Sequence, residues 1–172
     1  MKTNYTWTQE TPWGALKISA TSDGVHSVRL RSGTSRQALD PTAPGEVGEF
    51  ARAFRRFFAG ETEALDGVKV DLSSVDNDFQ RKVLTTLRTR IGPGKTISYG
   101  ELAEAVGHPG AARAVGTAMA QNPVPIVVPC HRVLAAGGKL GGYGGGLEMK
   151  RGLLQLEGAT EAGELFTRSA TA

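Results

Sequence analysis

The sequence predicts an α+β protein in which a small strand-and-helix domain over residues 1–75 precedes a mainly helical domain over residues 76–158. Two observations predict this division. Apolar residues alternate along parts of the first half, as in strands, and a helical spacing follows them. In the second half, two short helices flank a tight turn, which is the shape of a helix-turn-helix. We expect residues 159–172 to form a flexible tail.

The first domain begins with a predicted hairpin. Residues 14–20 and 24–30 alternate in part on either side of a Ser-Asp-Gly turn. Residues 31–45 are rich in Ser, Thr, Pro and Gly and predict a loop. Apolar residues at three- and four-residue spacing over 47–58 predict an amphipathic helix. Residues 68–72 alternate again, so we expect a third strand there.

The second domain is predicted to be helical. A helix over 79–87 is terminated by Gly92-Pro93-Gly94. Ser98 and Glu101 have the spacing of a capping box, in which each side chain binds the other residue's backbone amide. The helix that they begin should end at Gly107, and Pro109 suits the first position of the next helix.

Charge differs between the two halves of the chain. Residues 1–78 hold 9 basic and 11 acidic residues, whereas residues 79–157 hold ten basic and four acidic ones. A basic half favours a polyanionic partner, although solvated surface charge is an equal alternative. No apolar run reaches the ~20 residues that a membrane helix needs, and Met1–Glu10 lacks a signal-peptide core. We therefore expect a soluble, cytoplasmic protein with no membrane partner.

One predicted helix carries a single long charged side chain. Arg113 is the only formally charged residue between Glu104 and Arg132, and its neighbours are Ala and Gly. Such a helix could be packed inside the protein with Arg113 reaching solvent. Alternatively, the helix could enter a nucleic-acid groove and insert Arg113, and the basic half favours this second interpretation.

The chemistry is expected at the only cysteine. An apolar strand over residues 123–129 leads directly to Cys130, His131 and Arg132. A lone cysteine is often a buried small hydrophobe, but adjacent cations would lower its pKa and favour the thiolate. Glu157 ends a helix predicted over 147–156, where a carboxylate faces the negative end of the helix dipole. A protonated imidazole would relieve that placement, and a frayed surface glutamate is the alternative.

These residues belong to a recognisable pattern. Four motifs in this order resemble the O6-alkylguanine-DNA alkyltransferase family: Ser98-Tyr99, Ala111-Ala-Arg-Ala-Val-Gly116, Asn122-Pro-Val-Pro-Ile126 and Pro129-Cys-His-Arg132. The likeness is close over residues 79–158 and looser in the first half. It implies a ribonuclease-H-like first domain and a winged-helix-like second domain that binds DNA.

The resemblance also implies a mechanism. The protein would flip an alkylated guanine out of the duplex, and Cys130 would take the alkyl group from O6 as a permanent thioether. His131 would act as a base through a water molecule, and Glu157 would orient His131. Tyr99 would help to rotate the nucleotide and protonate the departing guanine, while Arg113 would fill the vacated stack.

Further positions follow from the same resemblance. Asn122 would brace the turn that presents Cys130. The base pocket would be lined by Val133, Tyr143 and Gly144, within a glycine-rich loop over residues 137–146. The small residues that would lie close to DNA beside Tyr99 and Arg113 are Ala111, Ala112 and Gly116.

The sequence departs from the family pattern in places. Leu84 stands where many relatives carry Trp, and Gly144 replaces a Ser, so its amide remains the only donor there. The first half has no cysteine for the structural zinc of some relatives, and we expect neither metal nor cofactor. We expect a monomer without an obligate protein partner, and no transcriptional role. Duplex DNA containing O6-alkylguanine is the implied substrate, and O4-alkylthymine is left open.

Two other function classes are compatible with parts of the pattern. One is a non-catalytic binder of damaged DNA; such alkyltransferase-like proteins lack the cysteine, so Cys130 disfavours this class. The other is a cysteine hydrolase, which would turn over a small ester many times without DNA.

Overall fold

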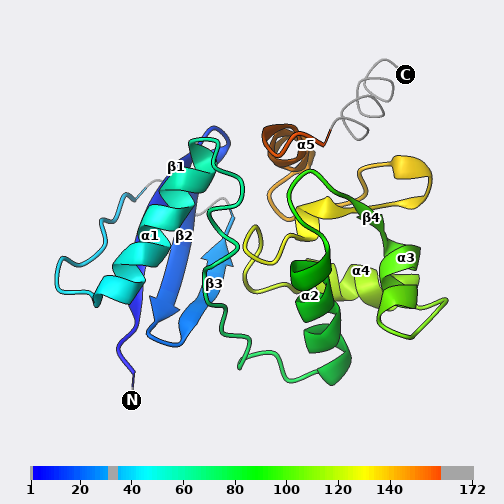
Figure 1. The fold of residues 1–172 in the computed structure, drawn as a ribbon, viewed down its shortest axis with the longest axis horizontal. Helices are drawn as coiled ribbons and strands as arrows, with labels where there is room; N and C mark the ends of the chain where they lie inside the picture. Colours follow the sequence, from blue (N-terminus) through cyan, green and yellow to red (C-terminus); the bar gives the residue numbers. More distant parts are fainter. Residues whose placement is uncertain (1, 31–34, 160–172) are drawn as a thin grey trace. The chain divides into compact units, whose positions relative to one another are not determined.

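The computed structural model describes residues 2–30 and 35–159, and Figure 1 shows the course of the chain. The described residues form two compact units. The first contains residues up to 74 together with residues 123–127, and the second contains residues 75–122 and those from 128 onward. Cys130 and every other predicted site residue belong to the second unit.

The first unit is a three-stranded antiparallel sheet covered by one helix (Figure 1). Strands β1 (Tyr5–Thr11), β2 (Gly14–Thr21) and β3 (Gly24–Arg29) pair in that order, and the predicted hairpin is β2–β3. Helix α1 (Gly45–Phe58) packs its apolar face on the sheet, where the Phe54 ring meets the edge of Trp7 at a centroid distance of 6.4 Å. The predicted helix over 47–58 is therefore present.

Two strand expectations in this unit need correction. Strand β1 was not predicted, although its Trp7 is almost fully buried. Residues 68–72 do not form a full strand but one parallel bridge, in which the Val25 amide donates to the Lys69 carbonyl at 2.9 Å. The Asp71 amide returns a 2.9 Å bond to Val25, and the Ser73 amide then bonds to the Asp71 side chain, so that the chain turns away.

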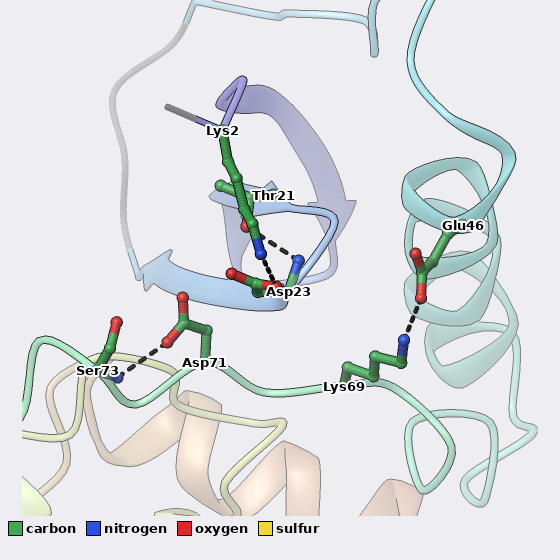
Figure 2. A network of polar contacts seen from close by, with 7 residues as sticks. All are labelled: Lys2, Thr21, Asp23, Glu46, Lys69, Asp71 and Ser73. Atoms are coloured by element: carbon green, nitrogen blue, oxygen red, sulfur yellow. Dashed lines mark hydrogen bonds and ion pairs between the residues drawn. The ribbon is translucent and has the colours of Figure 1, made fainter.

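Exposed polar contacts surround this bridge (Figure 2). Lys2 pairs with Asp23 at the hairpin turn, and Lys69 pairs with Glu46 of α1 at 2.5 Å. Because the four side chains are 39–61% exposed, these pairs add little to stability. The unit is held mainly by its apolar core, and this polar cluster carries no chemistry that we can identify.

The second unit is mainly helical, as predicted. Its elements are α2 (Asp78–Arg90), β4 (Ile97–Ser98), α3 (Tyr99–Ala105), α4 (Ala112–Ala120), the 3-10 turns η1 (Cys130–Arg132) and η2 (Ala136–Gly138), β5 (Val133–Leu134) and α5 (Leu147–Leu156). Strands β4 and β5 are parallel, with Ile97 opposite Val133. The α+β class predicted from the sequence is thus confirmed.

Helices α3 and α4 form the expected helix-turn-helix. The capping box is present: the Glu101 amide donates to the Ser98 hydroxyl at 3.0 Å, and the Ser98 amide donates to the Glu101 carboxylate at 3.2 Å. This places Tyr99 at the first position of α3. The expectation that Pro109 begins the next helix is wrong. Gly110 has a φ of +85°, which no right-handed helix accommodates, so α4 starts at Ala112.

The apolar segment before the cysteine is not the predicted strand. Residues 123–129 form a series of turns, because three of the seven are prolines without an amide to donate. Ile126 even adopts a φ of +77°, a conformation rare for a β-branched residue. Residues 123–127 join the first unit, where the Val28 amide of β3 donates to the Pro123 carbonyl at 2.9 Å.

The far end of the described chain is packed. Ala159, which the sequence assigned to the tail, is buried in an apolar cluster with Leu134, Leu140 and Leu154. The expectation of a flexible tail otherwise concerns residues 160–172, which lie outside the described residues. Among the described helices, none has the length and apolar character needed to cross a bilayer.

Candidate active site

The site is built around Cys130, the first residue of η1. Cys130 is only 7% exposed. The Cys130 amide donates to the Val128 carbonyl at 2.8 Å, and the Asn122 side-chain amide donates to the same carbonyl at 3.0 Å. Asn122 follows α4, so this shared acceptor connects the cysteine turn to the end of that helix.

His131 and Glu157 lie in contact, although 26 positions separate them. The His131 Nε2 atom is 2.9 Å from Glu157 Oε1, and both side chains are fully buried. Glu157 caps the C-terminus of α5, which brings its carboxylate to η1. The other ring nitrogen of His131, Nδ1, is buried and has no hydrogen-bond partner among the residues that the structure describes.

Arg132 completes this arrangement, and the sequence interpretation missed it. Its Nε and Nη2 atoms donate to the two oxygens of Glu157 at 3.0 and 2.5 Å, and its Nη1 donates to the Ile91 carbonyl at 2.6 Å. Glu157, at the end of its helix, therefore has Arg132 as a partner in addition to His131. The position of Arg132 beside the motif was visible, but its side-chain direction required the fold.

The protonation states follow from these contacts. Burial opposes the charge on Glu157, but the charges and hydrogen bonds of His131 and Arg132 prevail and lower the pKa of Glu157 to about 2. Burial also lowers the pKa of His131, with Glu157 opposing it. A neutral His131 beside an ionised carboxylate must donate through Nε2. Its unpartnered Nδ1 is therefore a lone pair that can accept a proton.

A cavity of about 410 Å³ opens beside the helix-turn-helix. It is lined by residues from the start of α3, from α4 and from the segment after β5: Ser98, Tyr99, Gly100, Ala112, Arg113, Gly116, Ala135 and Ala136. Five of the eight are glycine or alanine, so the walls are largely backbone and methyl groups. The volume is within the range of small-molecule sites, and Arg113 is exposed at this cavity.

Tyr99 connects the cavity to the cysteine. Its ring is half-buried, and both burial and the charge of Cys130 raise the pKa of its hydroxyl, which is therefore protonated at neutral pH. The remaining residue predicted on this face, Ala111, precedes α4 as its N-cap without a side-chain hydrogen bond.

The predicted base-pocket residues flank the cysteine from two segments. Val133 is fully buried in β5. Tyr143 lies in the glycine-rich loop with its ring 6.5 Å from that of His131, and its buried hydroxyl has no hydrogen-bond partner within residues 2–30 and 35–159. Burial, followed by the charges of Cys130 and Glu157, raises the pKa of Tyr143 well above its usual value. Gly144 is exposed in the turn that follows.

Within residues 2–30 and 35–159, no three His, Cys, Asp or Glu side chains gather as metal ligands would. Fold and site together define a class: a protein with a nearly buried cysteine in a unit that contains a helix-turn-helix.

Comparisons with known proteins give the family. Residues 78–159 match the model of the 6-O-methylguanine DNA methyltransferase DNA-binding domain. The methylated-DNA–protein-cysteine methyltransferase of Mycobacterium bovis is 44% identical over 153 residues, covering 87% of this chain and 90% of that protein. The human protein of the same name is 37% identical over 163 residues, covering 88% and 79% of the two chains.

Solved structures agree with this assignment. Mycobacterium tuberculosis OGT in complex with DNA superposes with a TM-score of 0.74 at 42% identity, covering 88% of this chain and 91% of that one. The O6-methylguanine-DNA methyltransferase of the archaeon Pyrococcus kodakaraensis superposes with a TM-score of 0.58 at 27% identity. This chain belongs to the methylated-DNA–protein-cysteine methyltransferase family.

Proposed function

We propose that this protein repairs duplex DNA by moving the alkyl group from O6 of guanine to the sulfur of Cys130. The observation that carries the proposal is the buried contact between Glu157 and His131, the residue that follows Cys130 in the chain. The Nε2 atom of His131 is held by Glu157, and the free Nδ1 lone pair remains as the only proton-accepting position of the ring. Family membership supports the same chemistry.

The reaction balances with groups that the chain supplies. The thiol proton passes through a water molecule to Nδ1 of His131, while Glu157 stabilises the resulting imidazolium. The thiolate attacks the alkyl carbon, a C–S bond forms, and the C–O6 bond breaks with its electron pair going to the guanine. The Tyr99 hydroxyl protonates the departing guanine and recovers a proton through solvent, so that the net transfer is from thiol to base.

The cavity beside α4 supports base flipping. O6 of guanine lies within the stack, so the nucleotide must leave the duplex before Cys130 can reach the alkyl carbon. We propose that Tyr99 helps to rotate the nucleotide, that Arg113 occupies the vacated stack, and that Ala111, Ala112 and Gly116 allow α4 to lie close to the duplex. Val133, Tyr143 and Gly144 would then bound the flipped base, and Asn122 would hold the turn at Cys130.

Irreversibility follows from the cysteine chemistry. A thioether is a poor leaving group, and the sequence contains no second thiol to displace it. Each molecule should therefore act once. Because its substrate is chromosomal DNA, we propose that the protein acts at the DNA in the cytoplasm, as a monomer.

A titration of damaged duplex tests the proposal. Duplex DNA carrying one O6-methylguanine is mixed with the protein at several ratios, and restored guanine is counted at completion. We expect one guanine restored per protein molecule, with no further product on longer incubation. Continued turnover would contradict the proposal, and turnover of a small ester without DNA would instead support a cysteine hydrolase.

A further inference from the structure

Lys150 is a buried charged residue of the second unit that has no part in the proposed chemistry. Lys150 lies on α5 and is fully buried, which is rare for a lysine unless it is paired. Its Nζ atom donates three hydrogen bonds, all to backbone carbonyls: to Val133 at 2.7 Å, to Gly142 at 3.2 Å, and to Leu140. A buried ammonium with every proton used in this way is a built feature, because leaving any of these groups unpaired would be costly.

The three carbonyls come from the two segments that flank Cys130. Val133 belongs to β5, directly after η1, whereas Leu140 and Gly142 belong to the glycine-rich loop. A loop with this much glycine has a high conformational entropy to lose on ordering. One ammonium therefore ties a flexible wall of the base pocket to a strand that is fixed by pairing with β4.

The tethered loop lies against Tyr99. Gly141 stands between the two tethered carbonyls with a φ of +69°, and a Cβ atom at this glycine would meet the Tyr99 hydroxyl at 3.2 Å and its ring at 3.3 Å. The backbone of the loop is thus a close support for the side chain that faces the cavity. A shift of the loop by an ångström would move this support away.

We propose that Lys150 is a positioning residue, whose ammonium holds the glycine-rich loop to β5 so that Gly141 supports Tyr99 in its reactive position. This inference rests on the proposed function. Lys150 does not touch the reacting atoms, and it acts through the carbonyls of Val133, Leu140 and Gly142.

The tether should depend on pH. Burial lowers the pKa of Lys150 to about 8, and the charge of Cys130 opposes this shift. The other titratable groups of the surrounding elements are His131 on η1, Tyr143 and the exposed Lys139 in the loop, and Tyr99 on α3. Arg132 and Glu157 pair with each other, and Glu148 and Arg151 lie on α5 itself. Above pH 8 the neutral amine keeps only two protons for three carbonyls, so the tether weakens as the pH rises.

A ratio of two rates isolates this effect. Transfer from duplex DNA carrying O6-methylguanine at saturating concentration and alkylation by iodoacetamide both need the Cys130 thiolate, but only transfer needs the pocket. Dividing the first rate constant by the second removes the thiolate fraction. The ratio is measured from pH 6.5 to 9.0 for the wild type, for Lys150→Met, and for Lys139→Met, an exposed lysine of the same loop.

For the wild type, we expect the ratio of the transfer rate to the alkylation rate to be constant at low pH and to fall through about pH 8. The Lys139→Met variant should show the same pH dependence as the wild type. Lys150→Met should lower the ratio about tenfold to a hundredfold and make it independent of pH. Gly141→Ala should reproduce the loss without removing the pH dependence. The inference would be overturned if Lys150→Met had the same ratio as the wild type, or if its ratio still fell near pH 8. A wild type that transfers nothing but still reacts with iodoacetamide would instead refute the proposed function.

Discussion

At the scale of single residues, the proposed mechanism separates an acceptor, Cys130, from the groups that would activate it. His131, Glu157 and Arg132 form a buried chain of contacts. The sequence predicts roles for Cys130, His131 and Glu157, because residue types and spacing indicate candidates. The role of Arg132 depends on where its side chain points, which only the packing of α5 on η1 determines.

The proposed roles of these residues predict that Cys130→Ala binds DNA but transfers no alkyl group. Binding is assigned to α4 and the basic residues of the second half of the chain, which the substitution leaves unchanged, and a methyl group fits where the thiol was. Fluorescence anisotropy with duplex DNA containing O6-methylguanine measures the binding. Affinity within about threefold of the wild type is expected. Loss of binding in a variant with an unchanged circular dichroism spectrum would show that the assignment is wrong.

Glu157 should be a stability determinant as well as an orienting group. Glu157→Gln leaves the buried Arg132 without its anion, and breaking a buried pair in this way costs about 3–5 kcal/mol at pH 7. Since the pKa of Glu157 is lowered to about 2, the wild-type advantage is complete above the unfolded-state pKa of about 4.3 and is lost as the pH falls towards 2.

Urea unfolding at pH 7, 4 and 2.5 measures this difference. Glu148→Gln is the matched control, because Glu148 is an exposed carboxylate on the same helix, and its substitution should stay within about 0.5 kcal/mol. A Glu157→Gln deficit that is equally large at pH 2.5 and pH 7 would mean that the carboxylate charge is not what stabilises the fold.

At the scale of secondary structure, we propose that the helix-turn-helix determines which substrates can reach Cys130. Arg113 is exposed on α4 at the cavity, and its planar guanidinium suits a gap in a base stack. Arg113→Ala should therefore slow repair of duplex DNA strongly and barely affect the reaction with free O6-benzylguanine, which needs no flipping. Single-turnover rate constants with both substrates measure the contrast.

A mismatch provides the internal control for this substitution. When the lesion lies opposite a mismatched base, extrusion costs less, so part of the lost rate should return. Equal losses with duplex DNA and free base would make Arg113 structural. In that case α4 would be a packed helix, which was the alternative interpretation of its Ala- and Gly-rich sequence.

Helices could be predicted from the sequence better than the segments between them. The capping box at Ser98 and Glu101 is local, and the structure contains it as the spacing indicates. The valines in the apolar run before Cys130 favour a strand, whereas its prolines disfavour one. Its turns, with Ile126 at a positive φ, depend on the packing of residues 123–127 in the first unit, which no local pattern contains.

At the scale of the whole molecule, the chain is specialised for one event. It contains a single thiol, and that thiol is nearly buried in the second unit. The first unit supplies a sheet, a helix and the segment that precedes the cysteine turn. Since the sequence contains no second thiol to displace the thioether, the proposed reaction consumes the protein.

Mass spectrometry of the protein after reaction tests this claim most directly. The protein is incubated with an excess of duplex DNA carrying O6-methylguanine, its intact mass is recorded, and its peptides are then sequenced. We predict a mass increase of one methyl group, located on Cys130, with no further increase at longer times. A methyl group on any other residue, or restored guanine without any change in the mass of the protein, would contradict the account.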